Sequence, residues 1–120
     1  MYTFIVNANS RSGLGREIWK KIETELRARS ISYEVFFTAP HRHTETLVQR
    51  LTSDRKPHTL VIVGGDGTIN EVINGILYPE NITLGYIPTG SGNDFGRSYR
   101  FPNNPLQALE LILSPPRIRN

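Results

Sequence analysis

The order of apolar segments along the chain predicts an α/β fold: a mostly parallel sheet flanked by helices, in three layers. Short apolar runs of strand length alternate with longer amphipathic segments. The run TLVIVGG, residues 59–65, has no polar interruption in its centre, which is typical of a strand covered on both faces and therefore of a parallel sheet. With 120 residues, 38% of them hydrophobic, and no linker-like segment, the chain should form one domain around one core.

The first half of the chain predicts two strands and two helices. A strand is expected around Phe4 and Val6, and an aromatic, β-branched segment predicts another at 32–38. Between them, residues 14–29 should form a helix whose buried stripe is Ile18, Trp19, Ile22 and Leu26. A second helix is expected around residues 47–51, followed by a polar loop over 53–57.

The second half repeats the alternation. After the strand at 59–65, a helix is expected to begin at Thr68, because Thr68 and Glu71 have the spacing of a capping box. A further strand is expected at 83–88 and a last helix at 104–113. The apolar stripe of the helix after Thr68 should be Ile69, Val72, Ile73, Ile76 and Leu77.

Composition excludes several classes of function. The chain has no cysteine, so it has neither disulfides nor thiolate chemistry, and no stretch reaches the length of a membrane span. Its net charge of +3 fits an ordinary solvated surface, with an anionic partner such as nucleotide, nucleic acid or membrane as the alternative. The N-terminus has a strand pattern and no basic region typical of a signal peptide.

The strongest candidate site follows the buried strand at Gly64-Gly65-Asp66-Gly67-Thr68. Its glycines allow backbone N–H groups to approach a ligand, and a helix start beside them is an anion site. A carboxylate at Asp66 would repel phosphates unless a cation neutralised it, and Mg²⁺ is the usual companion of nucleotide phosphates. The alternative is a tight turn in which Asp66 caps the helix.

A second loop, YIPTGSGNDFGR, follows the next strand in the same way. Ser91 and Asp94 supply polar groups, and two loops on adjacent parallel strands should face one crevice, so Asp66 and Asp94 are expected at the same ligand. The alternative is that Asn93 and Asp94 cap a short helix.

The turn after the first strand is a weaker candidate. Asn7, Ser10 and Ser12 can hydrogen-bond a ligand, but Ile18 stands where a dinucleotide fingerprint has its third glycine. No glycine-lysine-serine Walker pattern occurs, which argues against a P-loop NTPase. His41 and His43 lack nearby acids and are not expected to bind metal.

With these motifs, the sequence resembles the diacylglycerol kinase catalytic-domain family, which includes bacterial lipid kinases and sphingosine kinases. The resemblance covers essentially the whole chain. Its specific parts are the GGDGT loop with Asn70 and Glu71, and the later motif in which Ser91 replaces threonine. At the first turn, Ala8 replaces the usual proline and the loop is longer by two residues. The motif residues are Asn7, Ser12, Gly13, Thr38, Gly64, Gly65, Asp66, Gly67, Thr68, Asn70, Glu71, Pro88, Gly90, Ser91, Asn93, Asp94 and Phe95.

The resemblance implies a Rossmann-like nucleotide-binding domain, as at the N-terminus of diacylglycerol, NAD and phosphofructo-kinases. The residues then expected to bind ATP are Asn7, Ser12, Gly13, Thr38, Gly64, Gly65, Asp66, Gly67, Thr68, Asn70, Glu71 and Ser91. Mg²⁺ is expected at Asp66 and Asp94. A β-rich C-terminal domain, which in the family carries the lipid pocket and the general base, is expected beyond residue 120, so this chain alone should be nearly inactive.

The expected function is therefore transfer of the ATP γ-phosphate to a hydroxyl of diacylglycerol or a related lipid. The implied setting is the cytoplasm, with peripheral contact at the inner membrane face, no nucleic-acid partner, and compatibility with a homodimer. Arg97, Arg100, Arg117 and Arg119 are candidates for headgroup contact, with a solvated or interdomain role as the alternative. A kinase of NAD or another small molecule, or a non-catalytic nucleotide sensor, remains an alternative because the GGDGT loop alone does not define the acceptor.

Overall fold

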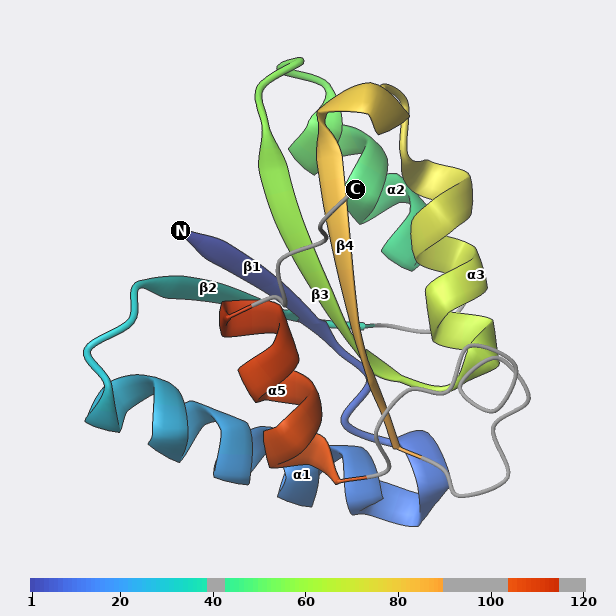
Figure 1. The fold of residues 1–120 in the computed structure, drawn as a ribbon. Coiled ribbons are helices and arrows are strands. Elements are labelled where there is room, and N and C mark those ends of the chain that lie inside the picture. Colours follow the sequence, from blue (N-terminus) through green and yellow to red (C-terminus); the bar gives the residue numbers. More distant parts are fainter. Residues whose placement is uncertain (39–42, 90–103, 115–120) are drawn as a thin grey trace, which may run out of the picture.

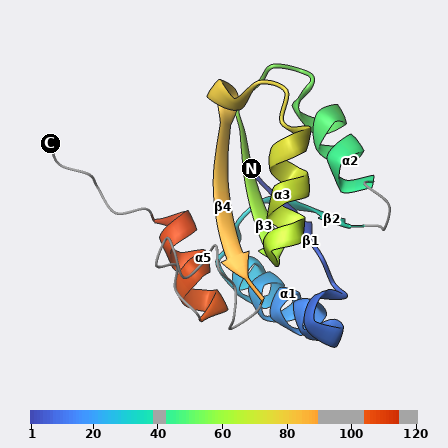
Figure 2. The same cartoon turned by 90° about the vertical axis from the view of Figure 1, so that its right-hand side faces the viewer.

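The computed structural model is a four-stranded parallel sheet covered by helices on both faces (Figures 1 and 2). It describes residues 1–38, 43–89 and 104–114, without the side chains of residues 10–12. The elements are β1 Tyr2–Val6, α1 Ser10–Ala28, β2 Tyr33–Phe37, α2 His43–Thr52, β3 His58–Gly64, α3 Asp66–Gly75, the short 3₁₀ helix η1 Pro79–Asn81, β4 Ile82–Pro88 and α5 Pro105–Leu113. Together they confirm the α/β prediction.

The strand order β2-β1-β3-β4 reverses direction once. From β1 the chain first moves to β2 on one side, and it later returns to β3 and β4 on the other. Crossovers of a single hand then require α1 on one face and α2 and α3 on the opposite face. Figure 2 shows α5 on one side of β4, with α2 and α3 on the other.

Each face of the sheet has its own apolar core, because alternate strand residues point to opposite sides. The core under α1 and α5 comprises Phe4, Val6, Ile18, Trp19, Ile22, Leu26, Val61, Val63, Ile87, Ala108 and Leu109. The core under α2 and α3 comprises Ile5, Val48, Leu60, Ile62, Ile69, Val72 and Tyr86. β3 supplies buried residues to both, as its uninterrupted apolar run predicted.

The predicted stripe of α1 is confirmed, and Trp19 anchors it. The Trp19 ring centroid lies 5.2 Å from that of Phe4 and 5.8 Å from that of Tyr33. The prediction for α3 is partly wrong. Ile69 and Val72 are buried, but Ile73 and Leu77 are 45% and 47% exposed, and the helix ends at Gly75 before Leu77.

Two helices begin earlier than the sequence predicted. α1 begins at Ser10 instead of residue 14, and it includes Gly13 at φ +97°, a backbone conformation outside the right-handed helical range that glycine adopts readily. α3 begins at Asp66 and its N-cap is Gly65, with no side-chain cap. The capping box at Thr68 and Glu71 is therefore wrong. By contrast, Asn104 caps α5 by accepting the Leu106 N–H at 2.9 Å.

Candidate functional site

The carboxyl ends of the four strands form one continuous edge. The N–H of Asn7 donates to the Val63 carbonyl at 2.8 Å, and the N–H of Thr38 donates to the Val6 carbonyl at 2.9 Å. The N–H of Thr89 donates to the Gly64 carbonyl at 3.2 Å. The sheet pairing thus continues one residue beyond β1, β2 and β4, and it brings residues distant in sequence side by side at this edge.

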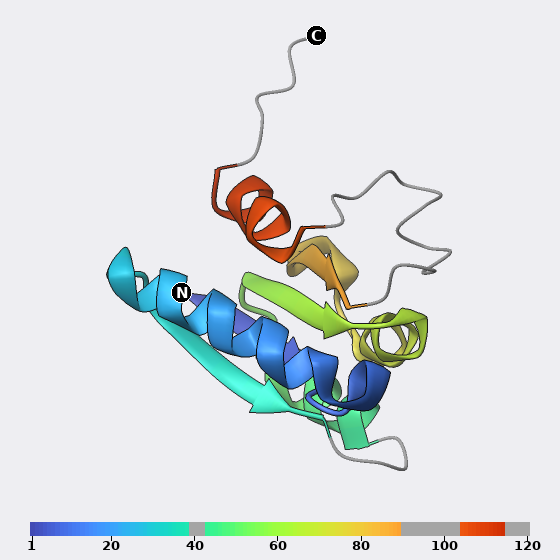
Figure 3. The same ribbon diagram turned by 90° about the horizontal axis from the view of Figure 1, so that it is seen from below.

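The reversal of strand order falls between β1 and β3, where the loops after these two strands lead to helices on opposite faces of the sheet. Open parallel sheets bind their ligands at such a point. Figure 3, seen from below, and Figure 1 both place the start of α1 beside the start of α3. Asn7 Nδ2 donates across this gap to Thr68 Oγ1 at 3.2 Å.

Gly64 is a glycine because Thr68 lies against it. A Cβ added to Gly64 would stand 2.6 Å from Thr68 Oγ1 and 2.8 Å from Thr68 Cβ. Thr68 itself is 6% exposed and sits in the first turn of α3. This contact sets how closely α3 follows the end of β3.

Gly65 and Gly67 have a different reason to be glycines. A Cβ added to either would meet no described atom within 4 Å. Gly65 has φ −102° and ψ −168°, an extended conformation open to any residue, and Gly67 has no positive φ. Neither packing nor backbone geometry within the described chain requires these glycines, which leaves two backbone N–H groups beside open space at a helix N-terminus.

Asp66 is the first residue of α3 and its side chain is exposed. A carboxylate in the first turn is favoured by the positive end of the helix dipole. It forms no ion pair with a described residue, so its oxygens face solvent beside the two glycines. An exposed carboxylate here fits one ligand of a Mg²⁺ ion that keeps waters and phosphate oxygens as its other ligands.

The structure describes only some of the other site residues predicted from the sequence. Asn70 is exposed and Glu71 half-buried, both on α3. Ser12 and Gly13 lie in the first turns of α1. Ser91 and Asp94 lie outside the described residues, as do Asn93 and Phe95. Within the described ranges, no group of three acidic or histidine side chains is placed to hold a metal ion.

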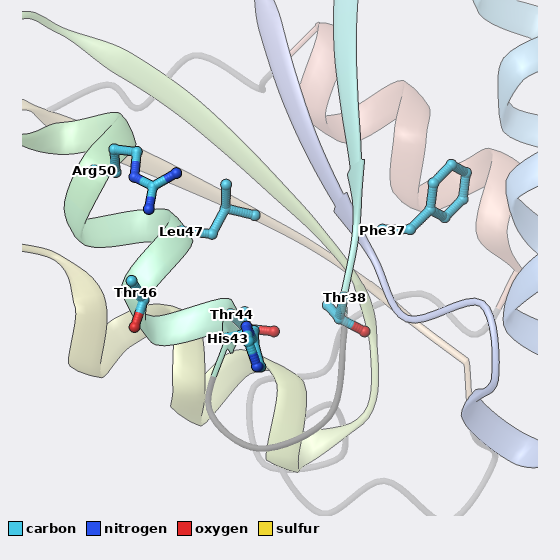
Figure 4. Close-up of a pocket in the computed structure, with 7 residues that line it drawn as sticks. All are labelled: Phe37, Thr38, His43, Thr44, Thr46, Leu47 and Arg50. Atoms are coloured by element: carbon cyan, nitrogen blue, oxygen red, sulfur yellow. The ribbon is translucent and has the colours of Figure 1, made fainter.

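A pocket of about 220 Å³ lies between the end of β2 and the first turns of α2 (Figure 4). Its lining comprises Phe37, Thr38, His43, Thr44, Thr46, Leu47 and Arg50. Figure 4 shows the Phe37 ring directed away from α2. Thr38 is the one residue of this lining that the sequence predicts as a site residue. The polar segment HTET at the start of α2 is the signal that could have added His43, Thr44 and Thr46.

Thr44 is the unusual member of this pocket. Its side chain is 1% exposed, and its Oγ1 has no hydrogen-bond partner among the described residues. A buried hydroxyl without a partner is uncommon in folded proteins. The pocket between β2 and α2 therefore has a polar group in its buried part as well as at its open side.

The protein-family model described as the diacylglycerol kinase catalytic domain matches residues 1–118 of the sequence. This chain belongs to that family. The match covers nearly all of the sequence, so the strand-end edge described above is the corresponding edge of a kinase-family domain.

Two curated proteins named as kinases are similar in sequence to this chain. The chain is 35% identical to "Putative lipid kinase YtlR" of Bacillus subtilis (strain 168), over 80% of this chain and 32% of the relative. It is 32% identical to a diacylglycerol kinase of Staphylococcus carnosus (strain TM300), over 82% of this chain and 34% of that protein. The chain thus spans about a third of the length of these curated relatives.

A solved structure shows the same fold. The crystal structure of a diacylglycerol kinase from Bacillus anthracis str. Sterne superposes with a TM-score of 0.74 at 30% identity. The superposition covers 92% of this chain and 38% of that one. No helix in the described part of the chain is both long and apolar enough to cross a membrane.

Proposed function

We propose that this chain is the nucleotide-binding domain of an ATP-dependent lipid kinase. The observation that carries the proposal is the open space at Gly65 and Gly67 beside the N-terminus of α3. Phosphate oxygens would accept hydrogen bonds from the backbone N–H groups of residues 64–68, where the helix dipole also favours negative charge. A side chain at either glycine would occupy the volume that the phosphates need.

Asp66 would hold Mg²⁺ at this loop, and Asp94 is proposed as a second ligand. The bound ion would neutralise phosphate charge during transfer. In this arrangement Asp66 provides a fixed carboxylate, because its backbone is the first turn of a helix anchored through the buried Ile69 and Val72. Its place between the two open glycines supports this role.

The rest of the ATP molecule would lie along the strand-end edge toward β2. Asn7 and Thr38 follow β1 and β2 in one row with the end of β3, and Thr38 opens onto the pocket beside α2. We place Ser12 and Gly13, in the first turns of α1, on the side of the nucleotide that faces α1. Asn70, Glu71 and Ser91 complete the proposed set around the phosphates.

The proposed acceptor is the hydroxyl of diacylglycerol or a related lipid. The bond between the γ-phosphorus and the β,γ-bridging oxygen of ATP would break and release ADP, a bond from phosphorus to the lipid oxygen would form, and the hydroxyl proton would pass to a base. We place that base and the lipid pocket in a β-rich domain outside residues 1–120, in keeping with relatives about three times as long. The 120-residue chain should then bind nucleotide and transfer little phosphate.

Calorimetric titration of the chain with ATP or ADP tests the nucleotide site. With Mg²⁺ present, the wild type should bind, and Asp66→Asn should lose about tenfold or more in affinity, the scale of removing one charged contact. Asp54→Asn is the matched control, because Asp54 is another exposed aspartate, next to the start of β3 at the opposite end of the sheet. Absence of ATP binding, or equal effects of the two variants, would overturn the proposal.

The acceptor requires a second assay, on the complete polypeptide that carries this domain. Diacylglycerol, phosphatidylglycerol, a sphingoid base and NAD are offered separately with labelled ATP. Phosphorylation of a lipid supports the proposal, and transfer to NAD alone would favour the small-molecule kinase. Nucleotide binding without transfer to any of them would favour a sensor domain.

A further inference from the structure

Asn7 and Thr68 are separated by 60 residues, yet their side chains meet at the carboxyl ends of β1 and β3. Asn7 Nδ2 donates to Thr68 Oγ1 at 3.2 Å, and Asn7 Oδ1 accepts the N–H of Asn9 at 3.2 Å. Both ends of the carboxamide therefore have partners within the protein. One bond shapes the turn after β1, and the other reaches the first turn of α3.

Thr68 has little freedom to move away from this contact. It is 6% exposed, and it packs so closely on the backbone of Gly64 that a Cβ added there would stand 2.6 Å from its Oγ1. The N–H of Asn7 also donates to the Val63 carbonyl at 2.8 Å, which holds the backbone of Asn7 next to the end of β3. Both partners are thus held in place, and their hydrogen bond joins the loop after β1 to the first turn of α3.

We propose that Asn7 is a positioning residue, which acts on ATP through Thr68 and not through a contact of its own. This inference rests on the proposed function. The bond holds the first turn of α3 against the end of β1. The N–H groups of residues 65–68 are therefore directed toward the proposed phosphate position before the nucleotide binds. Pre-organised donors bind more tightly, because less freedom is lost on binding.

A double-mutant cycle separates positioning from direct contact. Asn7→Ala and Thr68→Val should each weaken Mg²⁺–ATP binding by about fivefold to tenfold, the range for a lost hydrogen bond. The double variant should bind as weakly as either single variant and no more, since both changes remove one shared interaction. If Asn7 contacted ATP directly, the two losses would multiply, and that result would overturn the inference.

Two further variants identify the atom involved. Thr68→Ser keeps the hydroxyl and should recover most of the affinity that Thr68→Val loses. If serine and valine behaved alike, the hydroxyl would not be the relevant group. Thr24→Val is the matched control for loss of a threonine hydroxyl, because Thr24 Oγ1 donates to the Lys20 carbonyl on an exposed part of α1.

Amide hydrogen exchange without nucleotide tests the contact independently of ATP. The amides of residues 65–69 should exchange several-fold faster in Asn7→Ala and in Thr68→Val than in the wild type or Thr24→Val. Unchanged exchange in both variants would overturn the inference even if the wild type binds ATP. If exchange changed but no variant bound ATP, the contact between the loops would stand and both the proposed function and its positioning role for ATP would fail.

Discussion

The two ends of the sheet are built in different ways. At the amino end, side chains from successive loops satisfy one another: the Arg55 guanidinium lies 4.6 Å from the centre of the Tyr78 ring, and Asn81 Nδ2 donates to the Arg55 carbonyl at 2.9 Å. At the carboxyl end, Gly65 and Gly67 face open space and Asp66 points to solvent. Polar groups at the amino end bond to one another, whereas at the carboxyl end the Asp66 carboxylate and the backbone at Gly65 and Gly67 are open.

The largest expected effect of a single change at the carboxyl end is that of Gly64→Ala. The new methyl group would overlap the Thr68 side chain, and overpacking of this kind costs roughly 1–3 kcal/mol. Both the free energy of unfolding and the affinity for ATP should fall, as measured by urea denaturation and calorimetry. Gly85→Ala is the control in β4, where the added Cβ would meet the flexible end of Ile112 at 2.9 Å. Equal losses of ATP affinity in both variants would contradict the special role of Gly64.

Gly67→Ala should separate ligand binding from stability. Gly67 lies in the first turn of α3, and alanine in a helix is about 0.5–1 kcal/mol more favourable than glycine. The variant should therefore unfold at a higher urea concentration, while its affinity for ATP falls by about tenfold because the methyl group occupies the phosphate space. Unchanged ATP affinity in a folded Gly67→Ala variant would show that this space is not used.

Asn81→Ala should give the opposite separation at the amino end. Loss of its hydrogen bond to the Arg55 carbonyl should lower stability by about 0.5–1.5 kcal/mol. ATP affinity should stay at the wild-type value, since this residue lies just before β4 begins. A marked loss of nucleotide binding would contradict the division between the two ends.

The smallest expected effect concerns acid stability. The hydrogen bond from His58, at 2.8 Å, lowers the pKa of Asp54 from its ordinary value of 3.8. A lowered pKa in the folded state contributes stability above the ordinary value, and this contribution disappears as the pH falls through the lowered value. Asp54→Asn should therefore be slightly less stable than the wild type at neutral pH, with the difference shrinking below 3.8. Urea titrations on either side of that pH measure it, and a constant difference would exclude the pairing.

Most elements of this fold could be predicted from local patterns. The apolar run of β3 and the stripe of α1 depend on periodicity alone, so the parallel sheet, the buried face of α1 and the glycine loop after β3 were all accessible from the sequence. The helix starts were not. α1 begins at Ser10 although Gly13 within it takes a positive φ, and α3 begins at Asp66 although a capping pattern stands two residues later.

The sequence by itself determined that this chain is a parallel α/β domain of the diacylglycerol kinase catalytic family, because periodicity and the GGDGT motif are local properties. Only the tertiary structure decided which glycines of the GGDGT loop are in close contact with a side chain, and which side chain bonds to Thr68. Gly64 is crowded by Thr68, Gly65 is open, and Asn7 arrives from another strand. Such contacts depend on how β1, β3 and α3 pack together, and residues 61 positions apart carry no local signal of their meeting.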